Sequence, residues 1–80
     1  MSNNNDFNEF AKAKIQEKRN LVISENLADG GFTIAQQIII EEGSRRTTMF
    51  MKGAIHVDNI DGLYSIRDAM NEAIQKIETK

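Results

Sequence analysis

The stretch "HVDNID", which begins at His56, brings together the groups best suited to chemistry in this chain. The imidazole of His56 and the carboxylates of Asp58 and Asp61 are all ligands that divalent cations accept. Both aspartates are nevertheless explained by a helix that begins here, because acids at the N-cap and in the first turn stabilise helices. His56 is the only histidine, and neither Ser44 nor Ser65 is expected beside it as a nucleophile. We therefore predict no catalytic residue, no metal site, no cofactor and no enzymatic activity.

The composition limits the class of protein further. A chain of 80 residues forms a single domain, residues 1–80, of which residues 1–6, "MSNNND", are expected to be a disordered tail. Without cysteine there are no disulfides, so self-association is the expected source of added stability. The formal net charge of −2 argues against a dedicated duplex-DNA-binding protein, since phosphate neutralisation needs a basic surplus. No apolar run approaches a membrane span and no signal peptide is visible, which predicts a cytoplasmic protein without a membrane partner.

Residues 7 to about 19 carry a helical pattern. Asp6 and Glu9 have the spacing of a capping box, with Asp in the role of the N-cap residue. The apolar residues that fall on one helical stripe are Phe7, Phe10, Ala11 and Ile15. A first helix is therefore predicted here. Its basic residues either complement the helix dipole or form a partner-binding patch; they are Lys12, Lys14, Lys18 and Arg19.

The middle of the chain is rich in β-branched residues and contains two turn signals. Asp29-Gly30 is typical of a type I′ turn, and Gly43-Ser44 suits a type II′ turn. Two-residue loops at both signals fix two registers. The predicted pairs are Leu21 with Ile38, Ile23 with Gln36 and Leu27 with Phe32, then Ile40 with Thr47, Ile38 with Met49, Gln36 with Met51, Ile34 with Gly53 and Phe32 with Ile55. A three-stranded antiparallel meander follows.

These registers divide the strands between two faces. The inner, core-forming face is predicted to hold Leu21, Ile23, Leu27, Phe32, Ile34, Ile38, Ile40, Met49, Met51, Ile55 and Val57. The outer face is predicted to hold Val22, Ser24, Asn26, Thr33, Ala35, Gln37, Ile39, Glu41, Arg46, Thr48, Phe50, Lys52, Ala54 and His56. An enzyme would need a pocket that joins Glu25, Gln36 and His56, but the register places His56 on the face opposite the other two.

The end of the chain carries a second helical pattern. Asp58 is the predicted N-cap, and Asp61 lies in the first turn. The apolar residues at helical spacing are Ile60, Leu63, Ile66, Met70, Ala73, Ile74 and Ile77. This stripe is expected to cover the inner sheet face. The predicted fold is α+β, a three-stranded antiparallel β-meander with an N-terminal helix and a longer C-terminal amphipathic helix (α-β-β-β-α), with both helices on one side.

The outer face of the predicted sheet is then open, and it carries more apolar residues than a solvated face needs. Phe50 lies opposite Gln37 and next to Ile39 in the predicted register. An apolar cluster with a charged rim has the composition of an interaction surface. The predicted partner-binding residues are Gln37, Ile39, Arg45, Arg46, Thr48, Phe50 and Lys52.

Three uses of this face are open. In the first, the face packs against a second copy or another protein, with Phe50 and Ile39 as anchors. In the second, Phe50 stacks on a base of single-stranded nucleic acid, and Arg45, Arg46 and Lys52 contact phosphates. In the third, the N-terminal helix covers the face and closes the domain. We favour the first, a small binding protein that self-associates and binds a protein partner.

The stretch "FMKGAIHVDNIDGLYSIRDAMNEAI", a strand that runs into a helix through an acidic cap, is similar to the ends of small accessory proteins encoded by tailed bacteriophages. The resemblance implies an early or accessory protein that binds, and in some cases inhibits, a host or phage macromolecule in the host cytoplasm. It assigns no site residue.

Overall fold

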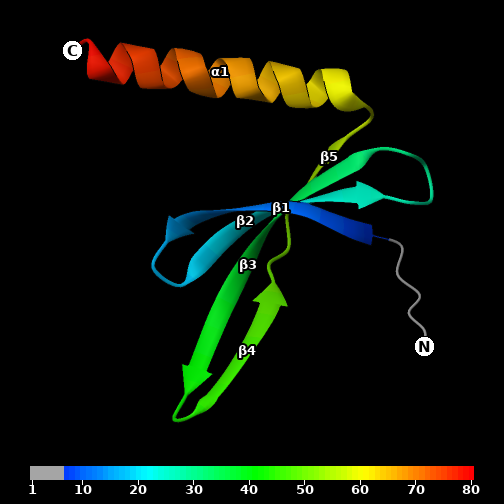
Figure 1. Cartoon of the computed structure of the whole chain (residues 1–80), viewed down its shortest axis with the longest axis vertical. Coiled ribbons are helices and arrows are strands. Elements are labelled where there is room, and N and C mark those ends of the chain that lie inside the picture. The colour runs from blue at the N-terminus through cyan, green and yellow to red at the C-terminus, as the bar shows by residue number, and fades with distance from the viewer. Residues whose placement is uncertain (1–6) are drawn as a thin grey trace.

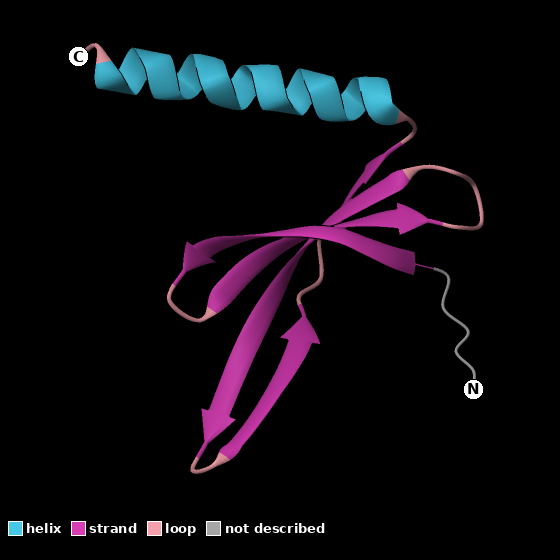
Figure 2. Cartoon of the chain, viewed as in Figure 1, coloured by secondary structure: helices cyan, strands magenta, loops and turns pink. Residues whose placement is uncertain are grey.

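The computed structural model describes residues 7–80 as an antiparallel sheet followed by one long helix (Figure 1, Figure 2). The elements are β1 (Phe7–Gln16), β2 (Arg19–Asn26), β3 (Phe32–Glu42), β4 (Arg45–Phe50), β5 (Ile55–Val57) and α1 (Ile60–Glu78). The strands are ordered β1-β2-β3-β4, and β5 pairs with β3 beyond the end of β4. The described residues therefore form an extended meander with more than the three strands predicted.

The predicted N-terminal helix is wrong, because Phe7–Gln16 forms β1 and pairs antiparallel with β2. The stretch "AKAKIQ" from Ala11 to Gln16 alternates small or apolar residues with polar ones, and this period of two is that of a strand. Ala and Lys are good helix formers, but helix propensity amounts to less than about 1 kcal/mol per residue, and backbone pairing with β2 outweighs it here. Asp6, the predicted cap, lies outside the described residues.

The two predicted turns differ in outcome. At Gly43-Ser44, Glu42 pairs with Arg45 and Gly43 has a φ of +62°, so the two-residue loop is confirmed. The two-residue loop at Asp29-Gly30 is wrong, because Asn26 N–H donates to the carbonyl of Gly31 (2.7 Å) around a four-residue loop. The register of β2 on β3 therefore moves by two residues, pairing Leu21 with Gln36, Ile23 with Ile34 and Glu25 with Phe32. A slip of two leaves every side chain on its predicted face.

The predicted third strand is interrupted at residues 51–54. Ile38 pairs with Met49 as predicted, but Ile34 pairs with Ile55 rather than with Gly53, and Phe32 pairs with Val57 rather than with Ile55. Two extra residues are taken up in a bend where Gly53 has a φ of +93°, a conformation that glycine tolerates without steric cost.

The core is small and matches the predicted inner face only in part, since Ile34 and Val57 are buried as predicted and Val22 is not on that face. Among residues 8–80 the buried apolar side chains are Val22 (1% exposed), Ile34 (5%) and Val57 (8%). Val22 was predicted to point outward, yet it is the most buried because it lies between Lys12 of β1 and Ala35 of β3 in the middle of the sheet. Met49, Met51 and Ile55, predicted as core, are 54%, 37% and 56% exposed. They lie on β4, β5 and the bend between them, the last segments of the sheet edge and thus without a further strand beside them.

The helix α1 begins one residue later than predicted. The N-cap is Asn59, whose Oδ1 accepts a hydrogen bond from the Asp61 N–H (2.9 Å), rather than Asp58. Asn59 is extended, and the helix that follows contacts the sheet at β5 and then runs above the other strands without packing on them (Figure 1). The prediction that α1 covers the sheet is therefore wrong for most of its length. Within residues 7–80 no helix has the length and apolar character that a membrane span requires.

Candidate binding surface

The sheet has two faces that differ in what lies over them. The helix-facing face carries Leu21, Ile23 and Ile34, which share a cleft with α1. The opposite face, called the Phe50 face below, carries Phe50 and its cross-strand partner Gln37. Because the predicted alternation of side chains survives both register slips, most of the predicted partner-binding residues stay together on the Phe50 face.

The structure places the predicted partner-binding residues as follows. Arg46, Thr48 and Phe50 lie on the Phe50 face of β4 and are exposed, and Ile39 of β3 is half-buried beside them. Gln37 is 7% exposed, and its Oε1 accepts a hydrogen bond from Nδ2 of Asn20 (3.4 Å). Arg45 alternates with Arg46 and so lies on the helix-facing face, while Lys52 lies in the bend between β4 and β5.

A cavity of about 270 Å³ opens on the Phe50 face beside the ring of Phe50. It is lined by Ser24, Thr33, Ala35, Phe50, Met51 and Ala54. Small side chains of β2 and β3 form its floor, while Phe50 and the bend at residues 51–54 form its wall. Phe50 itself is 54% exposed, so a partner would reach both the cavity and the ring.

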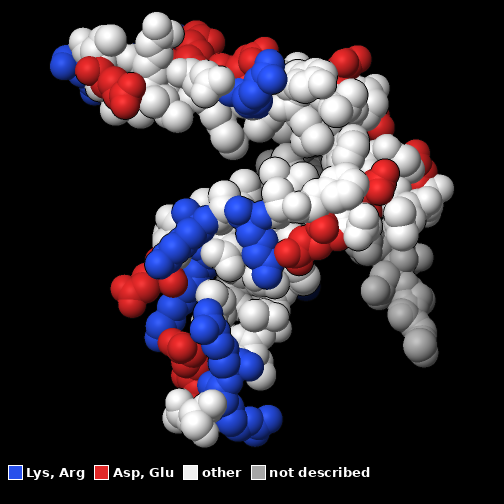
Figure 3. Space-filling view, viewed as in Figure 1, with Lys and Arg blue, Asp and Glu red and all other residues white. Residues whose placement is uncertain are grey.

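Lys12 and Lys14 add positive charge to this face, although they lie on a strand and not on the helix that the sequence predicted. They pair with Val22 and Asn20 of β2, so both point to the side of Phe50. The alternation in "AKAKIQ" was the signal that would have found them. Figure 3 shows Lys and Arg gathered over the β1–β2 and β3–β4 hairpins, with acidic residues among them.

Part of this positive charge is paired with carboxylates. Lys12 Nζ lies 3.5 Å from Glu9, and Lys18 Nζ lies 3.4 Å from Glu41. Arg46 is the cross-strand partner of the same Glu41, so Lys18 and Arg46 have one carboxylate between them. Residues 7–57 as a whole hold seven basic and six acidic residues, a net charge of +1. Charges balanced in this way suit the rim of a protein interface better than a phosphate-binding groove.

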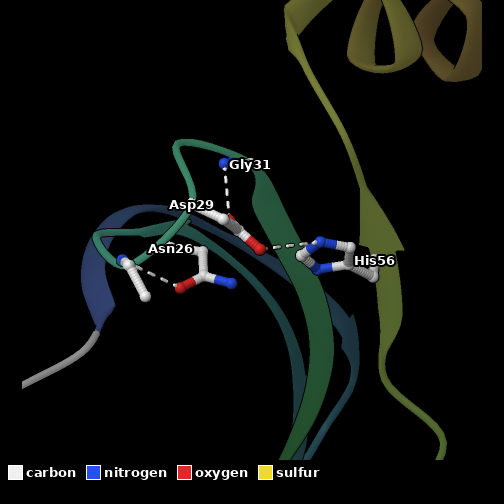
Figure 4. A network of polar contacts seen from close by, with 5 residues as sticks. Asn26, Asp29, Gly31 and His56 are labelled. Carbon is white, nitrogen blue, oxygen red and sulfur yellow. Dashed lines mark hydrogen bonds and ion pairs between the residues drawn. The ribbon is translucent and has the colours of Figure 1, made fainter.

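His56 supports the β2–β3 turn (Figure 4). Its Nε2 lies 3.5 Å from Oδ2 of Asp29, whose Oδ1 accepts a hydrogen bond from the Gly31 N–H (2.9 Å). Across residues 7–80 no three His, Asp or Glu side chains gather as a metal site would require. Glu25 and Gln36 lie on the helix-facing face, away from His56, as the register predicted.

A second cavity, which the sequence did not predict, separates α1 from the helix-facing face. This cleft has a volume of about 380 Å³ and is lined by Ala13, Leu21, Ile23, Ile34, Leu63, Ile66, Arg67, Met70, Asn71 and Ile74. Most of its lining is aliphatic on both walls, as in the core of a folded domain.

Comparison of the chain with protein-family models, with curated proteins and with solved structures found no match in any of the three.

Proposed function

We propose that this chain is a small non-enzymatic binding protein that holds a protein partner on its Phe50 face. The observation that carries the proposal is the cavity beside Phe50, an apolar hollow next to a half-exposed aromatic ring. Aromatic side chains next to pockets are typical anchors of protein interfaces. At about 270 Å³ the cavity falls just below the roughly 300–1,000 Å³ of small-molecule sites, and it suits one apolar side chain of a partner.

The surroundings of the cavity support a protein partner over a single strand of nucleic acid. Lys12 is paired with Glu9, and Glu41 lies next to both Lys18 and its cross-strand partner Arg46. A partner that carries both signs of charge would complement this rim, whereas a polyphosphate would have to displace the glutamates. The resemblance to phage accessory proteins is consistent with a host or phage protein as the partner.

A library of short random peptides displayed on a surface tests this proposal. We expect peptides enriched on the wild-type protein to share an apolar anchor residue and to lose binding to Phe50→Asp. Met49→Asp is the matched control. Met49 directly precedes Phe50, is equally exposed at 54% and points to the helix-facing face. Loss of binding in both variants, or in neither, would contradict the proposal.

Binding of fluorescent single-stranded DNA and RNA at low salt is measured alongside. An affinity that falls steeply with salt and is lost in Phe50→Asp would favour nucleic acid instead, because each neutralised phosphate releases condensed counterions.

A further inference from the structure

The cleft between α1 and the helix-facing face leaves apolar surface uncovered on both of its walls. On the helix wall, Met70 and Ile74 are each 51% exposed, and on the sheet wall Leu21 and Ile23 are half-buried. In a domain closed by its own helix, these side chains would pack against each other. The chain therefore presents two complementary apolar surfaces that it does not bring together.

The overall dimensions of the chain agree with an incomplete core. The accessible surface is 6285 Å², whereas a compact monomer of 9.0 kDa exposes about 4,900 Å². The radius of gyration is 15.1 Å, against about 11.6 Å for a compact domain of this length. Surface in excess of a compact monomer is expected when a chain completes its core with another chain.

The attachment of α1 explains how the cleft stays open. Gly62, in the first turn, packs so closely on Val57 that a Cβ at this position would overlap the Val57 side chain. Asn59 is extended (φ −157°, ψ 179°) and directs the helix away from β5. Figure 3 shows the rest of α1 projecting over an open space above the sheet. The helix is thus fixed at its N-terminal end, and its remaining turns are accessible to another molecule.

We propose that the occupant of this cleft is a second copy of the chain, with α1 of each copy packed on the helix-facing face of the other. A two-fold pair is favoured because each copy supplies the helix that its partner's sheet lacks, which leaves neither apolar surface exposed. The charges agree, since residues 58–80 carry a net charge of −2 and residues 7–57 a net charge of +1.

The area available is sufficient for a stable dimer. A helix of 19 residues is about 28 Å long and about 10 Å wide, so one helix–sheet contact buries about 600 Å² over the two surfaces. Two reciprocal contacts then bury about 1,200 Å², which reaches the size of specific protein interfaces.

This dimer uses the face opposite to Phe50 and is independent of the proposed partner-binding site. The sequence assigned self-association to the Phe50 face, whereas the larger uncovered apolar surface lies in the cleft. The two proposals are therefore separable by mutation, one on each face.

Light scattering across a dilution series provides the first test. We expect the wild type to be a dimer. In Ile74→Asp the dissociation constant of the dimer should be about a hundredfold higher, because the substitution weakens the affinity about tenfold at each of the two symmetric contacts. Ile74 is half-exposed in the single chain, so the variant should remain folded by circular dichroism. Phe50→Asp should dimerise as the wild type does, even if it loses every partner. A monomeric wild type at about 50 µM would overturn the dimer and leave the Phe50 proposal standing.

Cross-linking provides the second test, and it does not depend on the folding of Ile74→Asp. The chain contains no cysteine, so Ala13→Cys and Asn71→Cys place single thiols on the sheet wall and the helix wall of the cleft. A mixture of the two variants treated with a short bismaleimide should yield the mixed covalent dimer. Ser65→Cys, which is exposed and does not line the cleft, replaces Asn71→Cys as the matched control.

The chain that carries both Ala13→Cys and Asn71→Cys decides between the two ways of closing the cleft. A cross-link within one chain, with no covalent dimer, would mean that each helix closes on its own sheet and would overturn the proposal. Equal yields of mixed dimer from the Ser65→Cys control would also overturn it, because the cross-links would then report random collision.

Discussion

The two faces of the sheet differ in how the chain covers them. On the Phe50 face, the bend at residues 51–54 stays tied to the sheet, since the Met51 N–H donates to the carbonyl of Gln36 (2.9 Å). This bend lines a small cavity together with β2 and β3. On the opposite face, α1 is tied at one end through Gly62 and Val57, and a larger cleft remains.

The bend at residues 51–54 and the helix α1 differ in how they are joined to the sheet. A segment held by backbone hydrogen bonds to a neighbouring strand has a fixed distance from it. A helix joined by an extended linker depends on side-chain packing alone, and that packing is satisfied equally well by another chain. The Phe50 face therefore carries a small cavity, whereas the helix-facing face leaves a larger cleft open.

The largest expected effect concerns the buried centre of the Phe50 face. Val22→Asp should abolish cooperative unfolding, because it places an unpaired charge at a position that is 1% exposed. Val22→Ala should lower the free energy of unfolding by about 2 kcal/mol through the cavity it leaves. Urea denaturation followed by circular dichroism measures both. Met49→Asp, at a position that is 54% exposed, should leave the fold intact, and damage equal to that of Val22→Asp would contradict this assignment of burial.

The next effect concerns the attachment of α1. Gly62→Ala should lower the free energy of unfolding by about 1 kcal/mol, because overlap with Val57 outweighs the roughly 1 kcal/mol gained from helix propensity. In a Val57→Ala background the overlap is relieved, and the same Gly62→Ala change should become stabilising. A double-mutant cycle in urea measures this reversal of sign. Independent, additive effects would mean that Gly62 and Val57 do not fix the helix.

A smaller effect separates the two glycines on the outer edge of the sheet. Gly43→Ala and Gly53→Ala should each cost about 1 kcal/mol, since both positions have positive φ and neither Cβ would meet another atom. Gly43→Asn should recover most of that loss, because a φ of +62° lies in the left-handed region that Asn tolerates. Gly53, at +93°, lies outside this region, so Asn should not help there. Thermal unfolding curves of the four variants provide the comparison.

The smallest effect concerns the β2–β3 turn. His56→Ala should change the free energy of unfolding by no more than about 0.5 kcal/mol, because the contact between His56 and Asp29 is exposed. Asp29→Ala should cost about 1 kcal/mol, since the Gly31 N–H loses its acceptor. Asp29→Asn keeps an acceptor oxygen and should resemble the wild type. A larger loss in His56→Ala than in Asp29→Ala would assign the turn's stability to the ion pair instead.

Several features of the fold follow from the sequence because they depend on neighbouring residues. The Gly43-Ser44 turn, the strands on either side of it and the helix at the end of the chain are all predicted from local patterns. The division of side chains between the two faces is also predicted, because alternation survives a register slip of two. For that reason most of the predicted binding residues lie on one face.

The tertiary structure alone decided which local pattern prevailed and where the core lies. Phe7–Gln16 carries both a helical stripe and an alternating stretch, and pairing with β2 selects the strand. Val22 is buried because strands lie on both sides of it, which no property of valine or its neighbours in sequence reveals. The separation of α1 from the sheet likewise depends on the extended Asn59 and on the contact of Gly62 with Val57. Local patterns determine which side chains share a face, whereas burial depends on segments that are distant in sequence and meet only in the folded chain.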